Sequence, residues 1–353
     1  MIKLIEIKNM RFPLFWMGHI IGGTPKPWEY FKVENILVNS YDIINKKSAY
    51  QKIIEIGIKK FLGFDGPVML DSGGFFFLKK NIEIPIEEIM DLYEKANADL
   101  CVALDVPFHY TMSDLEKEKR IDTTLRNFEI MINSVNMKKV KLVPVIHGHN
   151  KKQIDKVINF YQKFDNFDIY GLGSLVPLMF PYTLKKWRIV IEIINYVKNR
   201  IGDSKLHIFG LGNAVTILLV LYLGVDSVDS VAWRKKAAFG TIQMPGIGQR
   251  FIKKGKSKSW TKQIDWKTFK CDCIICKGLS SSDALENLYS SFQKRALHNA
   301  WVFQKEVELF KEHSQNEKEL EKWLDVHLKE SALFKIYQYI KTLKVKKRAY
   351  LQF

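Results

Sequence analysis

Short apolar runs alternate with segments of helical periodicity over most of the chain, and this alternation constrains the fold more than any other feature. The runs rich in Val, Ile and Leu predict strands at Ile36–Asn39, Val68–Asp71, Leu100–Asp105, Lys141–His147, Ile169–Gly173, Leu206–Gly210 and Ser227–Val231. Helices are predicted at Pro85–Ala96, Lys151–Phe164, Thr183–Arg200 and Ala214–Leu223. This alternation, with a weaker eighth strand near Ala238–Gln243, predicts an α/β fold, a closed (β/α)8 TIM barrel.

Polar side chains fall at the carboxyl ends of different predicted strands. Asp71, Asp105, His147 and Asp229 each lie at or near the point where a strand ends. In barrels of this kind that end carries the active site, and a buried, unpaired carboxylate is too costly to recur there by chance. Side chains alternate along a strand, so Asp226 and Asp229 should point to opposite faces, and only one of them should line a pocket.

The turn after the second predicted strand suits close contact with a ligand. Gly73 and Gly74 directly follow Asp71 and Ser72, and two glycines let the backbone turn tightly. An ordinary turn with Asp71 as a helix cap is the alternative. Paired carboxylates from different strands are what glycosidic exchange needs, because one attacks the anomeric carbon and the other moves a proton on the leaving group.

Two histidines allow a different interpretation of the same strand ends. His147 and His149 share one strand face, as the ligands of a metal-dependent barrel hydrolase would. Such a site needs further histidines on other strands, and none is suitably placed in the sequence.

Three of the four cysteines fall within Cys271–Cys276. Three thiolates and one imidazole complete a tetrahedral Zn²⁺ shell of the structural type. A redox Cys-x-x-Cys pair is the alternative, but it needs no third cysteine two residues upstream. The predicted zinc ligands are Cys271, Cys273, Cys276 and His298. His207 and His313 are alternatives for the fourth ligand.

Composition indicates the partner and the compartment. The chain has 353 residues and a formal charge of +17, which favours a polyanionic partner such as nucleic acid, although a lysine-rich proteome could give the same balance. The start of the chain lacks the apolar core of a secretion signal, and the run Ala214–Leu223 is half of what a membrane span needs. The few cysteines suit a reduced compartment. We therefore expect a cytoplasmic protein without a membrane partner; a homodimer or helper proteins remain open.

The composition of the sequence changes after the predicted barrel. The segment Phe251–Lys270 is rich in lysine and contains Trp260 and Trp266, which favours phosphate contact over a merely solvated hairpin. Amphipathic helices are predicted at Ala300–Lys311 and Glu317–Tyr339. The expected domains are a catalytic barrel over 1–250, a basic zinc-binding subdomain over 251–300, and C-terminal helices packing on the barrel over 301–353.

Several short motifs, taken together and in order, resemble those of a known family. They are Asn39–Tyr41, Asp71–Phe75, Leu104–Pro107, Gly171–Pro177, Phe209–Gly212, Gly224–Ser230, Cys271–Cys276 and Leu297–Asn299. This set is similar to the signature of the tRNA-guanine transglycosylase superfamily, and the resemblance runs from about Asn35 to Phe303.

The resemblance implies a role for individual residues. Asp229 would be the nucleophile that attacks C1′ of a guanosine and holds a covalent intermediate, and Asp71 would be the general acid/base at the exchanged base. Binding of the base would fall to Ser72, Phe75, Asp105, His147, Gly173, Ser174 and Phe209. The cysteines and His298 would hold a zinc ion that shapes the nucleic-acid face. A non-catalytic accessory subunit is a further alternative, but it would have lost Asp71 or Asp229, and this chain has both.

Departures from the family pattern indicate a subtype. Ser230–Arg234 and Val176–Pro177 are closer to the archaeosine-type branch than to the bacterial queuosine enzymes, which carry Gln where His147 stands. A chain ending at Phe353 has no room for the RNA-binding module that normally follows an archaeosine-type barrel. A short, basic chain of this type resembles DpdA, the family that inserts 7-deazaguanines into DNA. We therefore expect DNA as the substrate, with a 7-deazaguanine such as preQ0 entering; archaeosine- or queuosine-type tRNA modification is the alternative.

Overall fold

The computed structural model describes residues 10–74, 85–252 and 269–350, and the chain divides into two compact units. The barrel unit comprises Met1–Gly23, Glu34–Phe209 and Val225–Asp229. The C-terminal unit comprises Thr24–Val33, Gly210–Gly224 and Ser230–Phe353. The second unit therefore draws two short segments from the middle of the barrel sequence.

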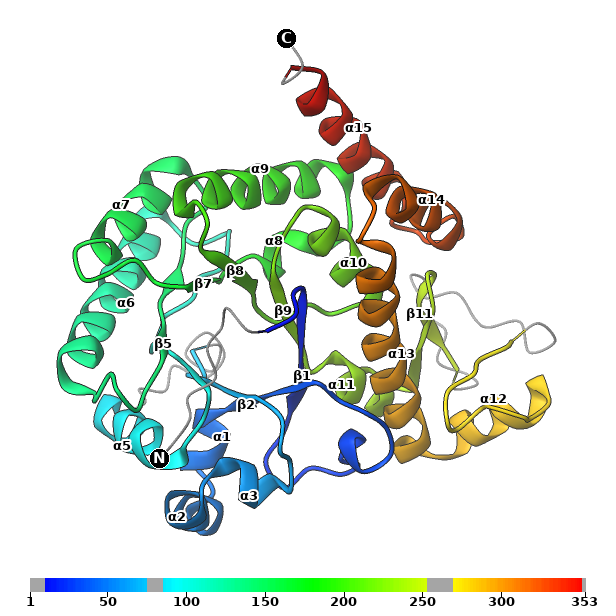
Figure 1. The fold of residues 1–353 in the computed structure, drawn as a ribbon, viewed down its shortest axis with the longest axis horizontal. Coiled ribbons are helices and arrows are strands. Elements are labelled where there is room, and N and C mark those ends of the chain that lie inside the picture. The colour runs from blue at the N-terminus through cyan, green and yellow to red at the C-terminus, as the bar shows by residue number, and fades with distance from the viewer. Residues whose placement is uncertain (1–9, 75–84, 253–268, 351–353) are drawn as a thin grey trace. The chain divides into compact units, whose positions relative to one another are not determined.

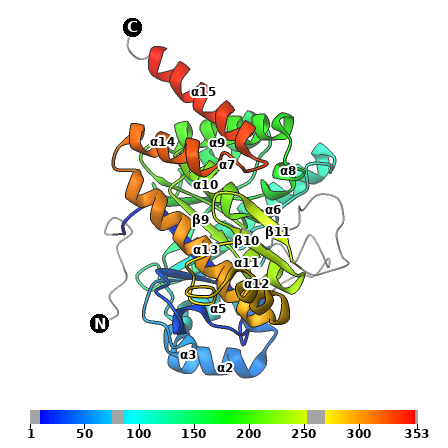
Figure 2. The ribbon, with the colours of Figure 1, turned by 90° about the vertical axis from the view of Figure 1, so that its right-hand side faces the viewer.

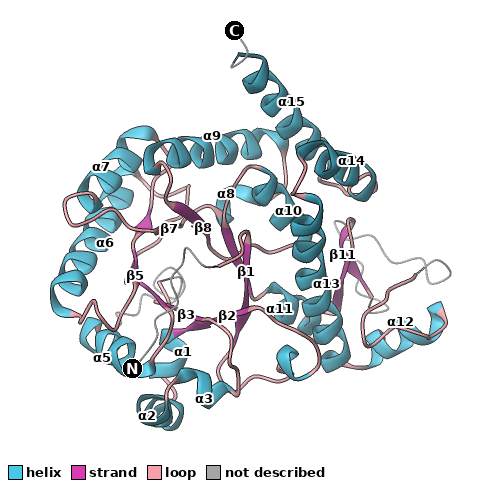
Figure 3. Ribbon diagram, viewed as in Figure 1, coloured by secondary structure: helices cyan, strands magenta, loops and turns pink. Residues whose placement is uncertain are grey.

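The barrel unit is built on parallel strands that form a ring (Figure 3). The strands are β1 Leu14–His19, β2 Asn35–Asn39, β3 Val68–Asp71, β4 Leu100–Val102, β5 Leu142–Val143, β6 Val145–Ile146, β7 Ile169–Leu172, β8 Lys205–Ile208 and β9 Ser227–Ser230. Their hydrogen-bonded order is β5-β4-β3-β2-β1-β9-β8-β7-β6. Only Pro144 separates the two end strands β5 and β6, and a proline has no N–H for a strand ladder. One interrupted strand thus closes the ring, which has eight strand positions and confirms the predicted (β/α)8 fold.

One barrel strand, β1, was not predicted from the sequence. The helical segment that normally separates two strands is absent between β1 and β2, where the described residues form only the short 3₁₀ helix Pro27–Glu29. Without a crossover helix, the alternation that predicted the other strands gives no signal. The proposed eighth strand near Ala238–Gln243 was wrong, because β10, Thr241–Met244, pairs antiparallel with β11, Gly248–Phe251, in a separate sheet.

Alternate side chains of the barrel strands fill its interior. A buried cluster collects one or two residues from most strands: Leu14, Trp16, Leu37, Met69, Leu100, Val102, Val143, Val145 and Ile169. The spacing of two within β1 and β4, and between Val143 and Val145, is that of side chains on one strand face. The barrel is therefore a packed core, and polar groups can line a pocket only at its ends.

Helices surround the strands of the barrel unit (Figure 1). They are α1 Ser40–Ile44, α2 Lys47–Ile56, α3 Ile58–Leu62, α5 Ile86–Ala96, α6 Asp114–Ser134, α7 Lys151–Tyr161, α8 Val176–Met179 and α9 Leu184–Ile201. Side-chain oxygens of Asn39, Ser113, Asn150 and Thr183 accept hydrogen bonds from backbone N–H groups in the first turn of α1, α6, α7 and α9. These N-caps fix where each helix begins after its loop.

The C-terminal unit is mainly helical and packs around one long helix (Figure 2). Its elements are α10 Ala214–Tyr222, α11 Ala232–Ala238, β10, β11, α12 Ser281–Ser290, α13 Phe292–His313, α14 Glu317–His327 and α15 Phe334–Tyr350. Helix α13 contacts α10, α11, α12, α14 and β10. It is longer than the predicted Ala300–Lys311 because Ser291 caps it with a hydrogen bond to Lys294 N–H.

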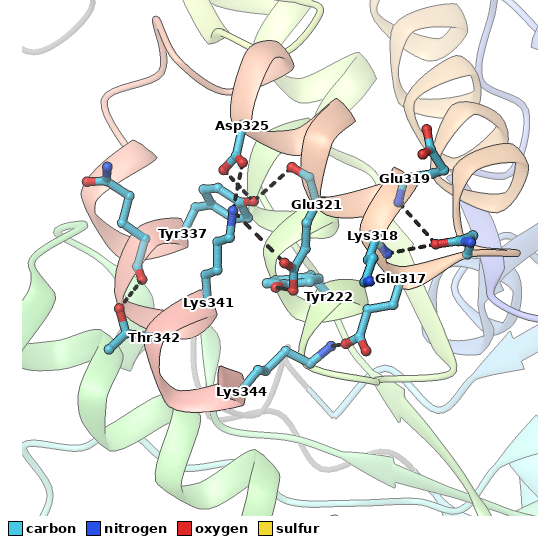
Figure 4. A network of polar contacts seen from close by, with 12 residues as sticks. Tyr222, Glu317, Lys318, Glu319, Glu321, Asp325, Tyr337, Lys341, Thr342 and Lys344 are labelled. Carbon is cyan, nitrogen blue, oxygen red and sulfur yellow. Dashed lines mark hydrogen bonds and ion pairs between the residues drawn. The ribbon is translucent and has the colours of Figure 1, made fainter. Parts of the chain in front are cut away.

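The predicted helix Glu317–Tyr339 is divided in the structure into α14 and α15. A polar network holds the two helices together and ties them to α10 (Figure 4). The Tyr337 hydroxyl donates to Asp325 over 2.9 Å, Lys341 pairs with the same carboxylate at 2.6 Å, and Lys344 pairs with Glu317 at 3.1 Å. No helix in the described part of the chain is long and apolar enough to cross a membrane.

Candidate active site and metal site

Asp71 ends strand β3, next to a partner on the adjacent strand. The β2–β3 register places Asn39 opposite Asp71, and the Asn39 amide donates to Asp71 Oδ2 over 2.7 Å. The amide oxygen of the same side chain accepts from Asp42 N–H and caps α1. Because the oxygen is engaged by the cap, the NH₂ group must face Asp71, so the orientation of the amide is fixed.

The surroundings of Asp71 favour its protonated form. Burial raises the pKa of Asp71, and the neighbouring Asp105 and Asp229 carboxylates raise it further, to about 8. Hydrogen bonds from Asn39 and the Gly73 backbone act in the opposite direction and are outweighed. Since the side chain keeps partial exposure, it can exchange its proton with a bound molecule. At neutral pH Asp71 is therefore poised to donate a proton.

The glycines after Asp71 allow a close approach between two loops. Gly73 has a φ of +91°, and a Cβ there would lie 2.7 Å from Tyr41 Cβ. A Cβ on Gly74 would lie 2.5 Å from the backbone oxygen of Asp105. Only glycine fits at these positions, and the packing brings the Ser72 hydroxyl within 2.8 Å of Asp105 Oδ1.

Asp105 is held at both oxygens by protein donors. Oδ1 accepts from Ser72, and Oδ2 lies 2.9 Å from His147 Nε2. On the far side of the ring, His147 Nδ1 lies 2.9 Å from the Ser174 hydroxyl, which itself accepts from Phe108 N–H over 3.0 Å. If the Ser174 hydroxyl donates to Nδ1, the ring hydrogen lies on Nε2 and faces Asp105.

His147 was predicted to contact the base. In the structure its ring contacts Asp105 and Ser174. Its side chain is 1% exposed, and both ring nitrogens contact protein groups. His149 contacts the Ser174 carbonyl oxygen through Nε2 at 3.0 Å, and burial lowers its pKa to about 4. Among the described residues, no group of three metal-binding side chains includes either histidine. The hydrolase alternative therefore finds no support.

Asp229 lies on β9, near His207 of β8, and His207 in turn contacts Phe209, the residue just after β8. The His207 Nε2 atom is 3.4 Å from Asp229 Oδ1, and the half-buried Phe209 ring packs edge-on against His207 with the ring centres 4.5 Å apart. Asp226 is engaged elsewhere, because its carboxylate accepts from Leu206 N–H and pairs with Lys198. The carboxylates of Asp226 and Asp229 thus contact different groups, as expected for side chains on opposite faces of a strand.

Gly173, Ser174 and Ser72 all lie in this part of the barrel unit, in the loops after β7 and β3. The Gly173 N–H is already bonded to the Ile146 carbonyl oxygen over 3.0 Å, and Ser174 has a φ of +61°. Phe75 falls outside the described residues. So does most of the basic segment Phe251–Lys270, including both of its tryptophans.

The predicted metal ligands converge in the C-terminal unit. The potential ligand atoms of Cys271, Cys273, Cys276 and His298 all lie within 4.8 Å of one another. His298 Nδ1 is 3.5, 3.4 and 3.8 Å from the three Sγ atoms in that order. With metal–sulfur and metal–nitrogen bonds of about 2.3 and 2.0 Å, the edges of a tetrahedron are about 3.5 Å long. The four side chains therefore fit a tetrahedral ion.

The second nitrogen of His298 supports the same conclusion. Nε2 lies 2.8 Å from the Gln243 carbonyl oxygen on β10, so it carries the ring hydrogen and leaves Nδ1 bare toward the cysteines. Cys273 and Cys276 are buried in a cluster with Ile242, Phe269 and Leu285. Neither alternative fourth ligand takes part, since His207 faces Asp229 and His313 stacks on Trp323.

Comparison with known proteins identifies a family for this chain. The model of one protein family, described as queuine tRNA-ribosyltransferase, matches residues 10–331. The chain belongs to the queuine tRNA-ribosyltransferase family. This membership confirms the resemblance drawn from the motifs at the level of the superfamily; the DpdA branch is not distinguished by it.

Three archaeal relatives illustrate the similarity. A tRNA-guanine(15) transglycosylase of Pyrococcus abyssi is 27% identical over 82% of this chain and 47% of its own length. One from Methanosarcina mazei is 28% identical over 84% of this chain and 58% of its own length. One from Methanococcus aeolicus is 31% identical over 68% of this chain and 36% of its own length. The chain spans about half the length of these relatives.

Two polar residues of this family member were missed as site residues by sequence reasoning. Asn39 was noted only as part of a motif, and its contact with Asp71 depends on the β2–β3 register. His207 was considered only as a metal ligand. A usable signal existed, because His207 and Phe209 alternate along one strand and so share a face.

Proposed function

We propose that the protein exchanges guanine in a nucleic acid for a 7-deazaguanine base. The observation that carries the proposal is the grouping of three acids, in which Asp105 and Asp229 help to raise the pKa of Asp71. The pKa of Asp71 is raised to about 8, whereas both Asp105 oxygens accept hydrogen bonds. An acid that holds its proton near neutral pH, next to a second carboxyl group, is the arrangement that glycosidic chemistry uses.

The reaction proceeds in two balanced half-reactions. A carboxylate oxygen of Asp229 attacks C1′ of the target nucleotide, the glycosidic C–N bond breaks, and its electron pair leaves with guanine. Guanine takes up the proton held by Asp71. The incoming base then gives its ring N–H proton to the Asp71 carboxylate and attacks C1′, which returns the ester electron pair to Asp229. Bonds broken and formed are alike in kind, so no ATP is required.

Recognition of the base is assigned to the residues around Asp105. The oxygens of its carboxyl group offer acceptors for the N1–H and 2-amino donors that guanine and 7-deazaguanines share. His147 and Ser72 orient that carboxylate through the contacts at 2.9 and 2.8 Å. Phe209 offers a partly exposed ring on which a base can stack, a contact worth about 1–3 kcal/mol. The nucleotide must leave its helical stack before C1′ can be reached.

We also propose that the cysteine cluster holds a structural Zn²⁺ ion. The ligands would be Cys271, Cys273, Cys276 and His298, and such a four-coordinate shell leaves no position for a substrate. The ion would join the cysteine loop to α13 and, through Gln243, to β10. Its contribution is to the structure of the C-terminal unit, and no reaction step passes through it.

For the polymer we propose tRNA, in place of the DNA favoured from the sequence. The relatives named above are tRNA-guanine(15) transglycosylases, so the comparisons support tRNA more strongly. The preference for DNA depended on the length of the chain and on its positive charge, and charge suits either polymer. DNA modification remains the alternative outcome of the test, with a preQ0-type base entering in either case.

The test measures base exchange in both polymers. The purified full chain is incubated with labelled guanine or preQ0 and with either tRNA or duplex DNA, and the nucleosides are then identified by mass spectrometry. Incorporation into tRNA supports the proposal; incorporation into DNA alone contradicts the choice of polymer; incorporation into neither contradicts base exchange.

A matched pair of variants tests the nucleophile in the same assay. Asp229→Asn should abolish incorporation and the covalent protein–nucleic acid adduct. Asp226→Asn, three residues away and engaged by Lys198 and Leu206, should leave incorporation unchanged. Exchange that survives in Asp229→Asn would show that another group attacks C1′.

A further inference from the structure

His207 is a buried, titratable side chain for which the proposed reaction has so far no use. It lies on β8, its side chain is fully buried, and the β8–β9 register places it directly opposite Ser227. Ser227 and Asp229 are two residues apart on β9, so their side chains share one strand face. His207 therefore lies between a buried hydroxyl group and the proposed nucleophile.

A chain of contacts leads from the barrel core to that nucleophile. Trp16 Nε1 donates to Ser227 Oγ over 2.9 Å, and Ser227 Oγ lies 2.8 Å from His207 Nδ1. His207 Nε2 then lies 3.4 Å from Asp229 Oδ1. All of these residues are at most 5% exposed. Water therefore does not compete for these contacts.

The direction of hydrogen bonding along this chain follows from the donors available. A tryptophan ring can only donate, so the Ser227 oxygen accepts from Trp16. Within the described part of the chain, the Ser227 hydroxyl has one other side-chain contact, with His207 Nδ1. The hydroxyl hydrogen therefore goes to Nδ1. A neutral ring that accepts at Nδ1 carries its own hydrogen on Nε2, which faces Asp229.

The donor on Nε2 is not satisfied by a good hydrogen bond. Its distance of 3.4 Å to Asp229 exceeds the 2.7–3.2 Å typical of N–H···O bonds, and Nε2 finds no other partner among the described residues. A buried donor without an acceptor is unfavourable. Hydrogen bonds in active sites are often long without substrate and shorten when it binds. The position of Nε2 fits a contact that tightens during the reaction.

We propose that His207 is a positioning residue that orients the Asp229 carboxylate through Nε2–H. The inference rests on the proposed base exchange. Nε2–H holds Oδ1 while the other oxygen attacks C1′, and it keeps the same atom as the carbonyl oxygen of the covalent ester. In the second half-reaction, the electron pair of the C1′–O bond returns to the carboxylate. The donor stabilises this returning charge without having to reorganise.

Two amide substitutions test the roles of the two ring nitrogens of His207 separately. In His207→Gln the side-chain NH₂ group can reach the position of Nε2 and face Asp229. In His207→Asn the amide reaches only the position of Nδ1, so the contact with Ser227 is kept and the donor toward Asp229 is lost. The variants share their chemistry and differ in which end of the ring they replace, so each controls for the other.

We expect turnover to fall in His207→Asn and to be largely kept in His207→Gln. His207→Asn should lower kcat for base exchange about 10- to 100-fold, with KM for the incoming base changed less than about 2-fold. His207→Gln should recover most of the lost kcat. Equal losses in both variants at similar melting temperatures, or a loss confined to KM, would overturn the positioning role.

A second measurement does not depend on activity. In the full wild-type chain labelled with ¹⁵N-histidine, ¹H–¹⁵N correlation spectra distinguish which ring nitrogen carries the hydrogen, and loss of the signal in His207→Asn assigns it. Hydrogen on Nε2 supports the proposed chain of contacts from Ser227 through His207 to Asp229. Hydrogen on Nδ1 overturns it. A wild-type protein that exchanges no base would overturn the proposed function and the catalytic role of His207, whereas the spectrum would still decide the direction of hydrogen bonding along this chain of contacts.

Discussion

The barrel site and the cysteine cluster gather ionisable side chains in opposite ways. In the barrel unit, the carboxylates of Asp105 and Asp229 raise the pKa of Asp71, and burial adds to the effect. In the C-terminal unit, three Sγ atoms surround His298 Nδ1 at 3.4–3.8 Å, around a point that one cation can satisfy. The first arrangement keeps like charges together, and the second is completed by an opposite charge.

This difference agrees with the two proposals, a reaction at the acids and structural stabilisation at the cysteines. Like charges held together disfavour the resting state of at least one group, and that free energy becomes available when a proton or a substrate arrives. A filled tetrahedral shell offers no open position and adds its binding energy to folding. The arrangement of charges, more than the number of polar residues, therefore distinguishes the two sites.

Removing the metal should have the largest effect. Cys273→Ser should lose bound zinc, measured by elemental analysis, and should melt the C-terminal unit at a lower temperature, because binding of a structural zinc contributes roughly 10 kcal/mol in small domains. Cys101→Ala is the matched control, since Cys101 lies in β4 of the barrel unit and not in the cluster. Full thermal stability in metal-free Cys273→Ser would show that the cluster has no structural role.

Replacing the proton donor should have the next largest effect. Asp71→Asn should lower kcat for exchange by about 10²- to 10⁴-fold, because an amide keeps the shape of the side chain but transfers no proton to the leaving base. The measurement is steady-state exchange with labelled guanine near pH 7. Activity within a factor of ten of wild type would remove Asp71 as the acid.

The same variant should alter the pH dependence of stability. The pKa of Asp71 in the folded protein, about 8, lies above the unfolded value of 3.8, so the folded state binds the proton more tightly between these values. The wild-type protein therefore loses stability as pH rises from about 4 to 8, and Asp71→Asn does not pay this cost. The variant should gain on the order of 2 kcal/mol over wild type by pH 8–9, measured by chemical denaturation. An equal difference at pH 5 and pH 9 would contradict the shifted pKa.

A smaller effect is expected from the neighbour of Asp71. Asn39 donates to Asp71 Oδ2 and so lowers the pKa of that carboxyl, in opposition to burial. Asn39→Ala should therefore raise this pKa and move the alkaline limit of exchange activity to higher pH by less than about one pH unit. The loss of the α1 cap should also cost about 1 kcal/mol of stability. A shift of the alkaline limit to lower pH would contradict the assigned direction of the hydrogen bond.

Local pattern in the sequence carried a large part of the fold and of the site. Strand β3 begins and ends where the periodicity predicted, and α5 differs from its predicted range by one residue. Asp71 and Asp229 were predicted as site residues because parallel strands place their carboxyl ends together, and their roles stay predictions. The cysteine cluster was found because closely spaced cysteines have few other uses in a reduced protein. Each of these signals is contained within a few consecutive residues.

Other features depended on contacts between distant segments. The sequence placed the eighth barrel strand near Ala238–Gln243, and the structure supplies β1 instead, because only closure of the ring decides which strands are neighbours. His147 was predicted to bind the base, which stays a prediction, and its contacts with Asp105 and Ser174 join segments far apart in the sequence.

The sequence by itself determined which groups are chemically available: two candidate catalytic acids, a set of metal ligands and an alternation that builds a barrel. Only the tertiary structure decided how those groups are charged and oriented. Asn39 faces Asp71, and Ser227 faces His207, because strand register aligns them. The physical reason is that periodicity is a local property of the chain, whereas hydrogen-bond partners, burial and pKa depend on residues brought together by folding.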